Sequence, residues 1–333
     1  MQLSHNSNEY IWYMNVHVII STHNGAYWIE KCINSVLNSS IDVHINIIDN
    51  VSTDQTVDLI QSKFPEVYLV RNEIDMGFAK SNNILLRKAI EEGADYVFLL
   101  NQDAWVEKDT IEGLIKILLQ NNQYGIVSPV HINGAGTALD FNFSTYCREN
   151  RCPGFLSDLY LKKIKEVYDL YFVNAALWLV SRECLLRIGL FDPMFTVYGE
   201  DVDYTNRSRA KGFKIGLAPY LRGYHDREKR PPSVKHNRLI AIIRQICILK
   251  DLNRNFYKEL FTYTVNFIKN LFMYLIRGKF DSLGAELKGG GHIFSSLKKI
   301  RRARRICRKD GAYIQICSNN KKSIKQLADM EIN

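Results

Sequence analysis

The sequence contains no long hydrophobic run, which argues against an integral membrane protein. Among its 333 residues there is no stretch of about 18 uncharged apolar residues, the length that a membrane-spanning helix requires. The nearest candidate, residues 261–276, is interrupted by Asn266, Lys269 and Asn270. The first ten residues are polar and lack the basic and apolar regions of a secretory signal. We therefore expect neither a membrane-spanning helix nor a signal peptide.

Short motifs that define several common enzyme classes are also missing. The sequence has no GxxxxGK[ST], no GxGxxG after a strand and no HExxH. These absences count against P-loop NTPases, dinucleotide-dependent enzymes and zinc proteases. The seven cysteines include no CxxC pair, and the neighbouring Cys147 and Cys152 have no His or further Cys close by in sequence. We expect reduced thiols in a reducing compartment and no zinc site.

Acidic and basic residues are unevenly distributed along the chain. The net charge is +9, but residues 235–333 carry 21 Lys and Arg against 7 Asp and Glu, a balance of +14. Residues 1–234 carry 23 Lys and Arg against 28 Asp and Glu, a balance of −5. This division predicts an acidic domain over residues 1–234 and a basic, mostly helical region over residues 235–333, facing an anionic partner.

Short apolar runs alternate with amphipathic segments in the first half of the chain, which predicts an α/β fold with a mostly parallel sheet flanked by helices. Polar side chains follow the runs at residues 16–21, 43–48, 67–70 and 96–100: Thr22, Asn24, Asp49, Asn50, Asn72, Asn101 and Asp103. Ligands of open α/β sheets bind beyond the carboxyl ends of the strands, so these residues predict a polar ligand site. The preference of Asn and Asp for turns explains any single one equally well.

Two groups of residues could carry chemistry. Asp103 ends an apolar strand, where a carboxylate is costly unless it is paired, exposed or bound to a metal, and Mg²⁺ or Mn²⁺ prefers such oxygen ligands. Glu200, Asp201 and Asp203 begin a predicted helix, where a carboxylate could accept a proton from an attacking hydroxyl. Capping of that helix explains the same three carboxylates. His225 follows a predicted strand and is, by itself, more typical of a packed histidine than of a ligand.

Five segments in order resemble the family 2 glycosyltransferases over about residues 14–226. They are VIISTHNG, IIDNVSTDQT, NEIDMGFAKSNN, YVFLLNQDAWVE and FDPMFTVYGEDVDYTNRSRAKGFKI. Within the family, the sequence is most similar to bacterial rhamnosyl- and galactofuranosyltransferases of surface-polysaccharide assembly. The resemblance implies a GT-A fold and an inverting transfer of a sugar from a dTDP- or UDP-sugar to a glycan hydroxyl. It also implies a nucleotide-sugar half at about residues 14–130 and an acceptor half at about 131–234.

The resemblance also implies roles for individual residues. Thr22 and Asn24 would line the nucleoside pocket, and Asp49 would accept the N3–H of uracil or thymine. Gly77 would approach the ribose and diphosphate. Asn72 and Asn101 would complete the nucleotide-sugar site.

For the chemistry, the resemblance implies that Asp103 ligates a divalent cation, Mg²⁺ or Mn²⁺, with His225 as a further ligand. Asp201 would be the general base, with Glu200 positioning it or the acceptor, although the sequence leaves open which of the two is the base. The family's acidic metal motif reads Asn101-Gln102-Asp103 here, so one acid is missing. This departure keeps a second hypothesis open: a catalytically degenerate protein that binds nucleotide sugars.

The basic region has two notable segments. Residues 256–280 mix Phe and Tyr with Lys and Arg, and residues 298–309 are strongly basic. Such segments are typical of helices that lie on an anionic membrane. We expect a cytoplasmic protein, peripheral on the inner face of the plasma membrane, that extends a lipid-linked glycan in O-antigen or other surface-polysaccharide synthesis. Packing of residues 256–280 against the domain is the alternative. No nucleic-acid partner is expected, because no nucleic-acid-binding motif accompanies the charge.

Overall fold

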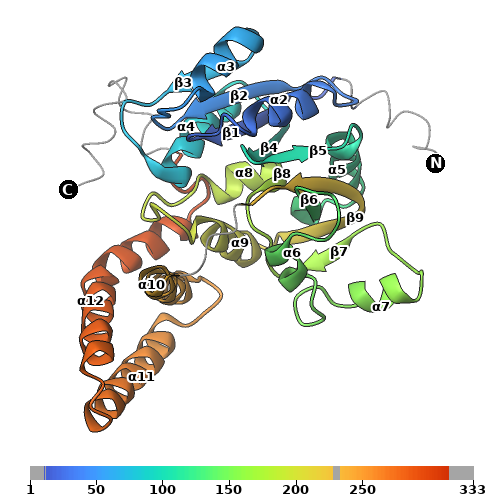
Figure 1. Ribbon diagram of the computed structural model, residues 1–333. Helices are drawn as coiled ribbons and strands as arrows, with labels where there is room; N and C mark the ends of the chain where they lie inside the picture. Colours follow the sequence, from blue (N-terminus) through green and yellow to red (C-terminus); the bar gives the residue numbers. More distant parts are fainter. Residues whose placement is uncertain (1–10, 12, 228–232, 315–333) are drawn as a thin grey trace.

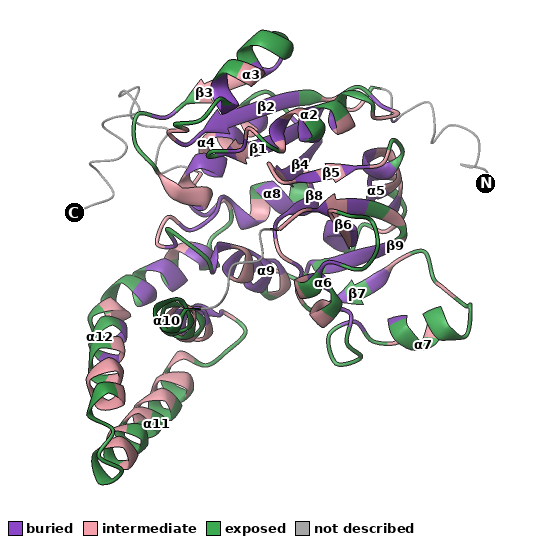
Figure 2. Ribbon diagram, in the orientation of Figure 1, coloured by how far each residue is buried: buried purple, intermediate pink, exposed green. Residues whose placement is uncertain are grey.

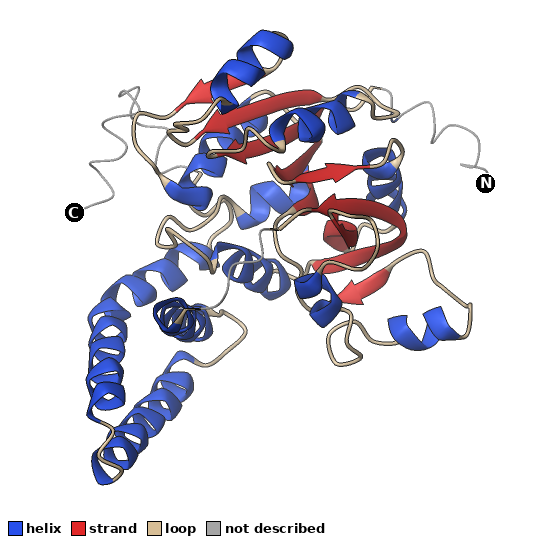
Figure 3. Cartoon of the chain, in the orientation of Figure 1, coloured by secondary structure: helices blue, strands red, loops and turns tan. Residues whose placement is uncertain are grey.

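The structure is a computed structural model that describes residues 11, 13–227 and 233–314 (Figure 1). The first ten residues, in which we expect no signal peptide, lie outside this part. A mixed sheet with helices on both faces occupies the first two thirds of the described chain, and three long helices follow it (Figure 3).

The strands of the sheet follow the order β3-β2-β1-β4-β8-β6-β9-β5, and β7 pairs with β9. Strands β3, β2, β1 and β4 run parallel, as the alternation of apolar and amphipathic segments predicts. Their bounds are β1 Val16–Thr22, β2 His44–Asp49, β3 Tyr68–Arg71 and β4 Tyr96–Asn101. The remaining strands are β5 Ala104–Val106, β6 Tyr124–Asn133, β7 Tyr168–Leu170, β8 Leu177–Ser181 and β9 Lys214–His225.

The register of the parallel strands brings their carboxyl ends together. Thr22 at the end of β1 lies beside Asp49 at the end of β2, and Ser21 lies beside Asn101 at the end of β4. The structure therefore confirms that the polar residues following these strands share one edge of the sheet. This edge is where the candidate site forms.

Alternating side chains of the strands bury against helices on the two faces. Val18 and Ile20 belong to the core beneath α2 and α5, whereas Ile19 belongs to the core beneath α4, α8 and α9. The helices that cover the sheet are α2 Ile29–Leu37, α3 Thr56–Lys63, α4 Gly77–Glu91, α5 Thr110–Gln120, α8 Arg182–Ile188 and α9 Glu200–Ala210. Residues 134–154, which lack a clear pattern, contain the short helix α6 Phe141–Tyr146, and α7 Phe155–Tyr160 follows.

The basic region forms three helices, α10 Val234–Lys250, α11 Phe256–Ile276 and α12 Phe280–Arg308. A separate core joins α10 and α12 to the segment before α9 through Phe195, Ile246, Leu249 and Ile300. Helices α11 and α12 project from the body as a hairpin (Figure 1). Within the described ranges, no helix is both long enough and apolar enough to cross a bilayer.

Candidate functional site

The loop after β1 is held against the loop after β4. The buried hydroxyl of Thr22 donates to Gln102 Oε1 over 2.6 Å, and the same oxygen accepts the backbone N–H of His23 at 2.9 Å. Gln102 Nε2 donates back to the His23 carbonyl oxygen at 3.1 Å. Thr22 therefore lies at the predicted edge of the sheet, but its hydroxyl group holds the two loops together.

Asn24 ties the loop after β1 to the loop after β2. Its backbone has a φ of 49°, in the left-handed region that Asn tolerates better than most residues. Its Oδ1 accepts the Thr53 N–H at 2.8 Å, and its own N–H donates to Ser52 Oγ at 2.8 Å. The side chain stays exposed at the mouth of the site.

Two buried acceptors at this edge have no hydrogen-bond partner among the residues that the structure describes. They are Oδ1 of Asp49 and Oδ1 of Asn72. Asp49 uses its other oxygen to accept the Ser52 N–H at 3.1 Å, and Asn72 uses its amide nitrogen to donate to Asn50 Oδ1 at 2.8 Å. Buried polar atoms without partners are rare in folded proteins, so these two oxygens are available to a ligand.

Gly77 occupies a position that no other residue fits without strain. Its φ is 71°, and a Cβ at this position would lie 2.4 Å from the carbonyl oxygen of Thr196. Glycine therefore lets the start of α4 touch the loop that leads into α9. Asn83 of α4 reinforces this contact by pairing with both the N–H and the carbonyl of Phe191, each at 2.9 Å.

Asp103 and His225 meet where β4 and β9 end. Strand β5 pairs with β9 so that Ala104 lies beside His225, and His225 Nε2 lies 3.3 Å from Asp103 Oδ1. The amide nitrogen of Asn101 lies 3.5 Å from the same imidazole nitrogen. The structure thus brings together the two residues expected to ligate a metal, together with the Asn that replaces the missing acid.

This pair has the chemistry of a divalent cation site. Two ligands in adjacent positions around an octahedral ion lie about 3 Å apart when each bond is about 2.1 Å, close to the observed separation. His225 is buried and its Nδ1 has no hydrogen-bond partner among the described residues; the nearest carboxylate oxygen, Asp140 Oδ2, is 4.0 Å away. A carboxylate behind a ligating histidine is the usual support for such a ligand. The described residues contain no group of three His, Cys, Asp or Glu arranged to hold a metal, so further ligands would come from substrate or water.

Glu200 and Asp201 form the first turn of α9. Gly199, with a φ of 92°, precedes them, and Phe195 and Ile243 pack where its Cβ would be. Desolvation raises the pKa of Asp201 to about 6, although hydrogen bonds from backbone N–H groups and the charge of Arg227 oppose this rise. Desolvation, together with the charge of Asp201, raises the pKa of Glu200 to about 8. Burial thus disfavours the charged form of both groups, and the charge of Asp201 adds to this effect at Glu200.

The carboxylate of Asp201 is connected to the strand edge through the backbone before β8. Among the hydrogen bonds that lower its pKa is one from the backbone of Ala175, and the next residue, Ala176, accepts the N–H of Asn101 at 3.0 Å. Arg227, whose charge acts on Asp201, pairs with Asp140 at 3.0 Å. Ionic and backbone contacts thus run from the Asp103–His225 pair to the proposed base.

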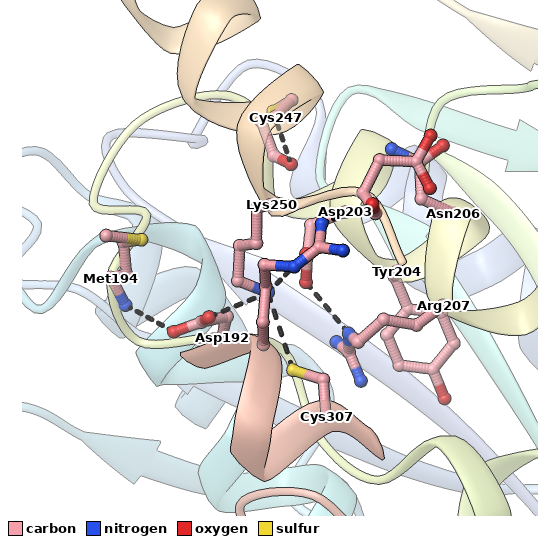
Figure 4. A network of polar contacts seen from close by, with 12 residues as sticks. Asp192, Met194, Asp203, Tyr204, Asn206, Arg207, Cys247, Lys250 and Cys307 are labelled. Atoms are coloured by element: carbon pink, nitrogen blue, oxygen red, sulfur yellow. Dashed lines mark hydrogen bonds and ion pairs between the residues drawn. The ribbon is translucent and has the colours of Figure 1, made fainter. Parts of the chain in front are cut away.

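Asp203, the third carboxylate of this segment, belongs to a buried ion network rather than to the site (Figure 4). It accepts from Arg207 Nε at 2.8 Å and also pairs with Lys250 at the end of α10. Lys250 Nζ lies 2.8 Å from Asp192, and Tyr313 donates to the same oxygen of Asp192 at 2.6 Å. This network joins the helix that carries Asp201 to the C-terminal helices.

Comparison with known proteins identifies the family of the domain that carries most of this site. Residues 17–182, about half of the chain, match the profile of glycosyl transferase family 2. These residues form a glycosyltransferase family 2 domain. The match covers β1 to β8 and includes all but three of the predicted site residues; Glu200, Asp201 and His225 lie beyond it.

Curated relatives of the family 2 domain act on different sugars. The chain is 22% identical over 162 residues to the low-salt glycan biosynthesis hexosyltransferase Agl10 of Haloferax volcanii, covering 48% of this chain and 52% of the relative. It is 30% identical over 106 residues to the abequosyltransferase RfbV of Salmonella typhimurium, covering 29% and 31%. The chain spans about half or less of the length of such relatives.

Solved structures share the fold at low identity. The S. aureus TarS 1–349 complex with UDP-GlcNAc superimposes with a TM-score of 0.55 at 14% identity, covering 89% of this chain and 86% of that one. GalNAc-T7 with UDP, GalNAc and Mn²⁺ gives a TM-score of 0.52 at 17% identity, covering 73% and 52%. The likeness shows that the family 2 domain has the expected GT-A fold.

Sequence reasoning missed several residues that build this site. Gln102 follows a strand between two predicted residues, so its position was a usable signal. Asp140 lies in a segment without a pattern, and no local feature connects it to His225. Arg227 follows His225 closely in sequence but acts on Asp201 only because the fold brings α9 to the end of β9.

Proposed function

We propose that this protein is an inverting glycosyltransferase that moves a hexosyl or deoxyhexosyl group from a UDP- or dTDP-sugar to a hydroxyl of a glycan. The observation that carries the proposal is the set of partnerless buried polar atoms at the predicted site. Asp49 Oδ1, Asn72 Oδ1, Glu200 Oε2 and His225 Nδ1 all lack a hydrogen-bond partner among the residues that the structure describes. They belong to four residues that were expected, from the sequence, to contact substrate or metal.

The nucleotide half of the site would bind the donor at the ends of β1, β2 and β4. The free oxygen of Asp49 is suited to accept the N3–H that uracil and thymine both carry. Asn72, at the end of β3, and Asn101, at the end of β4, offer further amide groups on either side, with Thr22, Asn24 and Gly77 shaping the loops around the nucleotide.

Asp201 would act as the general base. Its carboxylate takes the proton of the acceptor hydroxyl while that oxygen attacks the anomeric carbon from the face opposite the diphosphate. The bond from the anomeric carbon to the diphosphate oxygen breaks, and the nucleoside diphosphate leaves with the electron pair. One displacement of this kind inverts the anomeric configuration. Glu200, whose pKa is raised by burial and by the charge of Asp201, would position the acceptor or Asp201.

Asp103 and His225 would hold the divalent cation, Mg²⁺ or Mn²⁺. When bound, the ion supplies positive charge against the negative charge that develops on the leaving diphosphate. The neutral amide of Asn101 beside the pair predicts weaker metal affinity than a second carboxylate would give.

We further propose a lipid-linked acceptor and a peripheral position on the cytoplasmic face of an anionic membrane, in surface-polysaccharide synthesis. The support is the excess of basic residues in the region from residue 235 onward. Among donor sugars, rhamnose and galactofuranose follow from the sequence resemblance, and the hexosyl- and abequosyltransferase relatives support hexoses and dideoxyhexoses as a class.

A panel of UDP-, dTDP- and GDP-sugars, assayed for hydrolysis and transfer with and without Mn²⁺, tests the proposal. We expect turnover with at least one UDP- or dTDP-sugar, and a loss of about 10²- to 10⁴-fold in Asp201→Ala and Asp103→Ala. Activity that survives both substitutions would overturn the assigned site.

The second candidate is a nucleotide-sugar-binding protein without turnover, which the Asn at position 101 favours. Calorimetry that finds nucleotide binding, together with no turnover for any donor and acceptor, would support this candidate instead.

A further inference from the structure

Helix α11 carries an apolar stripe that stays exposed in the part of the chain that the structure describes. Of its 21 residues none is buried, which is unusual for a helix rich in Phe, Leu and Ile (Figure 2). Seven apolar residues are between 47% and 69% exposed: Tyr257, Phe261, Val265, Ile268, Phe272, Leu275 and Ile276. At about 100° per residue, all seven fall within an arc of about 100°, and the stripe is about 29 Å long.

The opposite side of α11 holds the helix in place. Tyr263 and Phe267 pack on Phe294 of α12, with ring centroids 5.8 and 5.5 Å apart. Gly290 of α12 leaves room for Phe267, because a Cβ there would lie 2.3 Å from the ring. The hairpin is therefore a packed unit with one face turned to the protein and a second apolar face turned to solvent.

Such a stripe fits either a second copy of the chain or a lipid surface, and the charge of the surrounding residues favours the lipid surface. Residues 233–314 carry 18 Lys and Arg against 5 Asp and Glu. Lys258 and Lys269 are exposed along one border of the stripe, and Arg277 and Lys279 are exposed at the tip of the hairpin. A second copy of the chain would bring two strongly basic surfaces together, whereas an anionic lipid surface attracts them.

We propose that the α11 stripe inserts into the headgroup region of an anionic bilayer and is the main membrane-binding surface of the protein. The sequence pointed to both residues 256–280 and residues 298–309, but the second segment alternates basic residues with residues buried against the body, such as Ile300 and Arg304. In the structure the apolar surface available to lipid is on α11, and the basic residues of both helices add electrostatic attraction. The proposal deepens the membrane location stated above, and its test uses no sugar donor, so it can fail or succeed independently of the transferase activity.

Flotation of the full chain with vesicles tests the proposal. We expect binding to vesicles that contain phosphatidylcholine and phosphatidylglycerol and at least tenfold weaker binding to phosphatidylcholine alone. The double variant Phe261→Ser/Phe272→Ser should weaken binding at least tenfold while its unfolding midpoint stays that of the wild type, because both side chains are exposed. The matched control is Tyr160→Ser/Leu161→Ser, which removes exposed apolar residues at the end of α7 and should leave binding unchanged.

A reporter variant gives a second readout. Phe272→Trp should shift its emission to shorter wavelength when phosphatidylglycerol vesicles are added, and Tyr160→Trp should not. Unchanged vesicle binding by the double variant would overturn the proposal. A wild-type dimer in solution that the double variant dissociates, without vesicle binding, would overturn it in favour of a second copy as the occupant.

Discussion

Replacing Lys250 with Met should destabilise the protein far more than the loss of a surface charge. Lys250 is 2% exposed, and its ammonium group pairs with Asp192 at 2.8 Å and with Asp203. Arg207 occupies the other oxygen of Asp203, so the four side chains balance two positive and two negative charges. Methionine keeps most of the volume and leaves one negative charge uncompensated in the interior.

The expected cost follows from breaking a buried pair by removing one partner, about 3–5 kcal/mol. For a protein of this size class that corresponds to a decrease in Tm of about 6–20 °C. The pH dependence has a definite sign. The charge of Lys250 lowers the pKa of Asp192 in the folded state, so the pair stabilises the protein above about pH 4 and this contribution is lost as pH falls through the folded pKa. The difference between wild type and variant should therefore shrink in acid.

Urea unfolding, followed by circular dichroism and tryptophan fluorescence, measures the effect. The matched control is Lys63→Met, which removes an exposed pair of similar length, Lys63 with Glu30 at 2.6 Å, and should cost at most about 1 kcal/mol. Adding Asp192→Asn to Lys250→Met restores neutrality and should recover at least about 1 kcal/mol relative to the sum of the single variants. A cost for Lys250→Met no larger than that of the Lys63→Met control would refute the reasoning.

Three further predictions concern the site. Activity should fall as pH decreases below about 6, because the pKa of Asp201 is raised to about 6 and the base becomes protonated. A wild-type kcat/KM profile that lacks this acidic decrease, while the Asp201→Glu profile shows it, would contradict the assignment. Gly77→Ala should cost about 1–3 kcal/mol of stability in urea unfolding and raise the donor KM, whereas Gly93→Ala, with a φ of 77° but no close neighbour, should show only the smaller backbone penalty. Asp49→Ala should raise the KM for uridine or thymidine donors about tenfold with little change in kcat, and an unchanged KM would show that this oxygen does not contact the base.

The edge of the sheet could be predicted because it depends on local patterns. Apolar runs of strand length followed by polar residues mark the carboxyl ends of parallel strands, and parallel pairing aligns those ends without further information. Asp49, Asn72, Asn101 and Asp103 were found in this way. The direction of β8 could not be predicted, since a fully apolar run such as residues 171–181 reads the same for a parallel and an antiparallel strand.

Residues that act through distant partners escaped the same reasoning. Asp203 resembled a third candidate base because its neighbours in sequence are carboxylates, yet its partner Lys250 lies 47 residues away. Asp140 carries no local signal, because its place behind His225 depends on the packing of a loop without periodicity. For α11, the pattern predicted an amphipathic helix, but its apolar positions cover more than half of the circumference. Sequence spacing does not tell which part of so wide a face packs on α12 and which part faces solvent.

The basic residues of the C-terminal region therefore have two different roles, which the net charge of the region does not distinguish. Lys250 and Arg304 are buried, and both serve the interior: Lys250 pairs with Asp192 and Asp203, and Arg304 donates to the carbonyls of Leu249, Asp251 and Arg254. The charge of Lys250 is compensated within its ion network and contributes little to attraction at a distance. The exposed residues of α11 and α12 provide the field that an anionic surface would feel. Because Lys250 also pairs with Asp203 of α9, the helix that presents Asp201, a salt bridge in the protein interior connects the C-terminal helices to the proposed base.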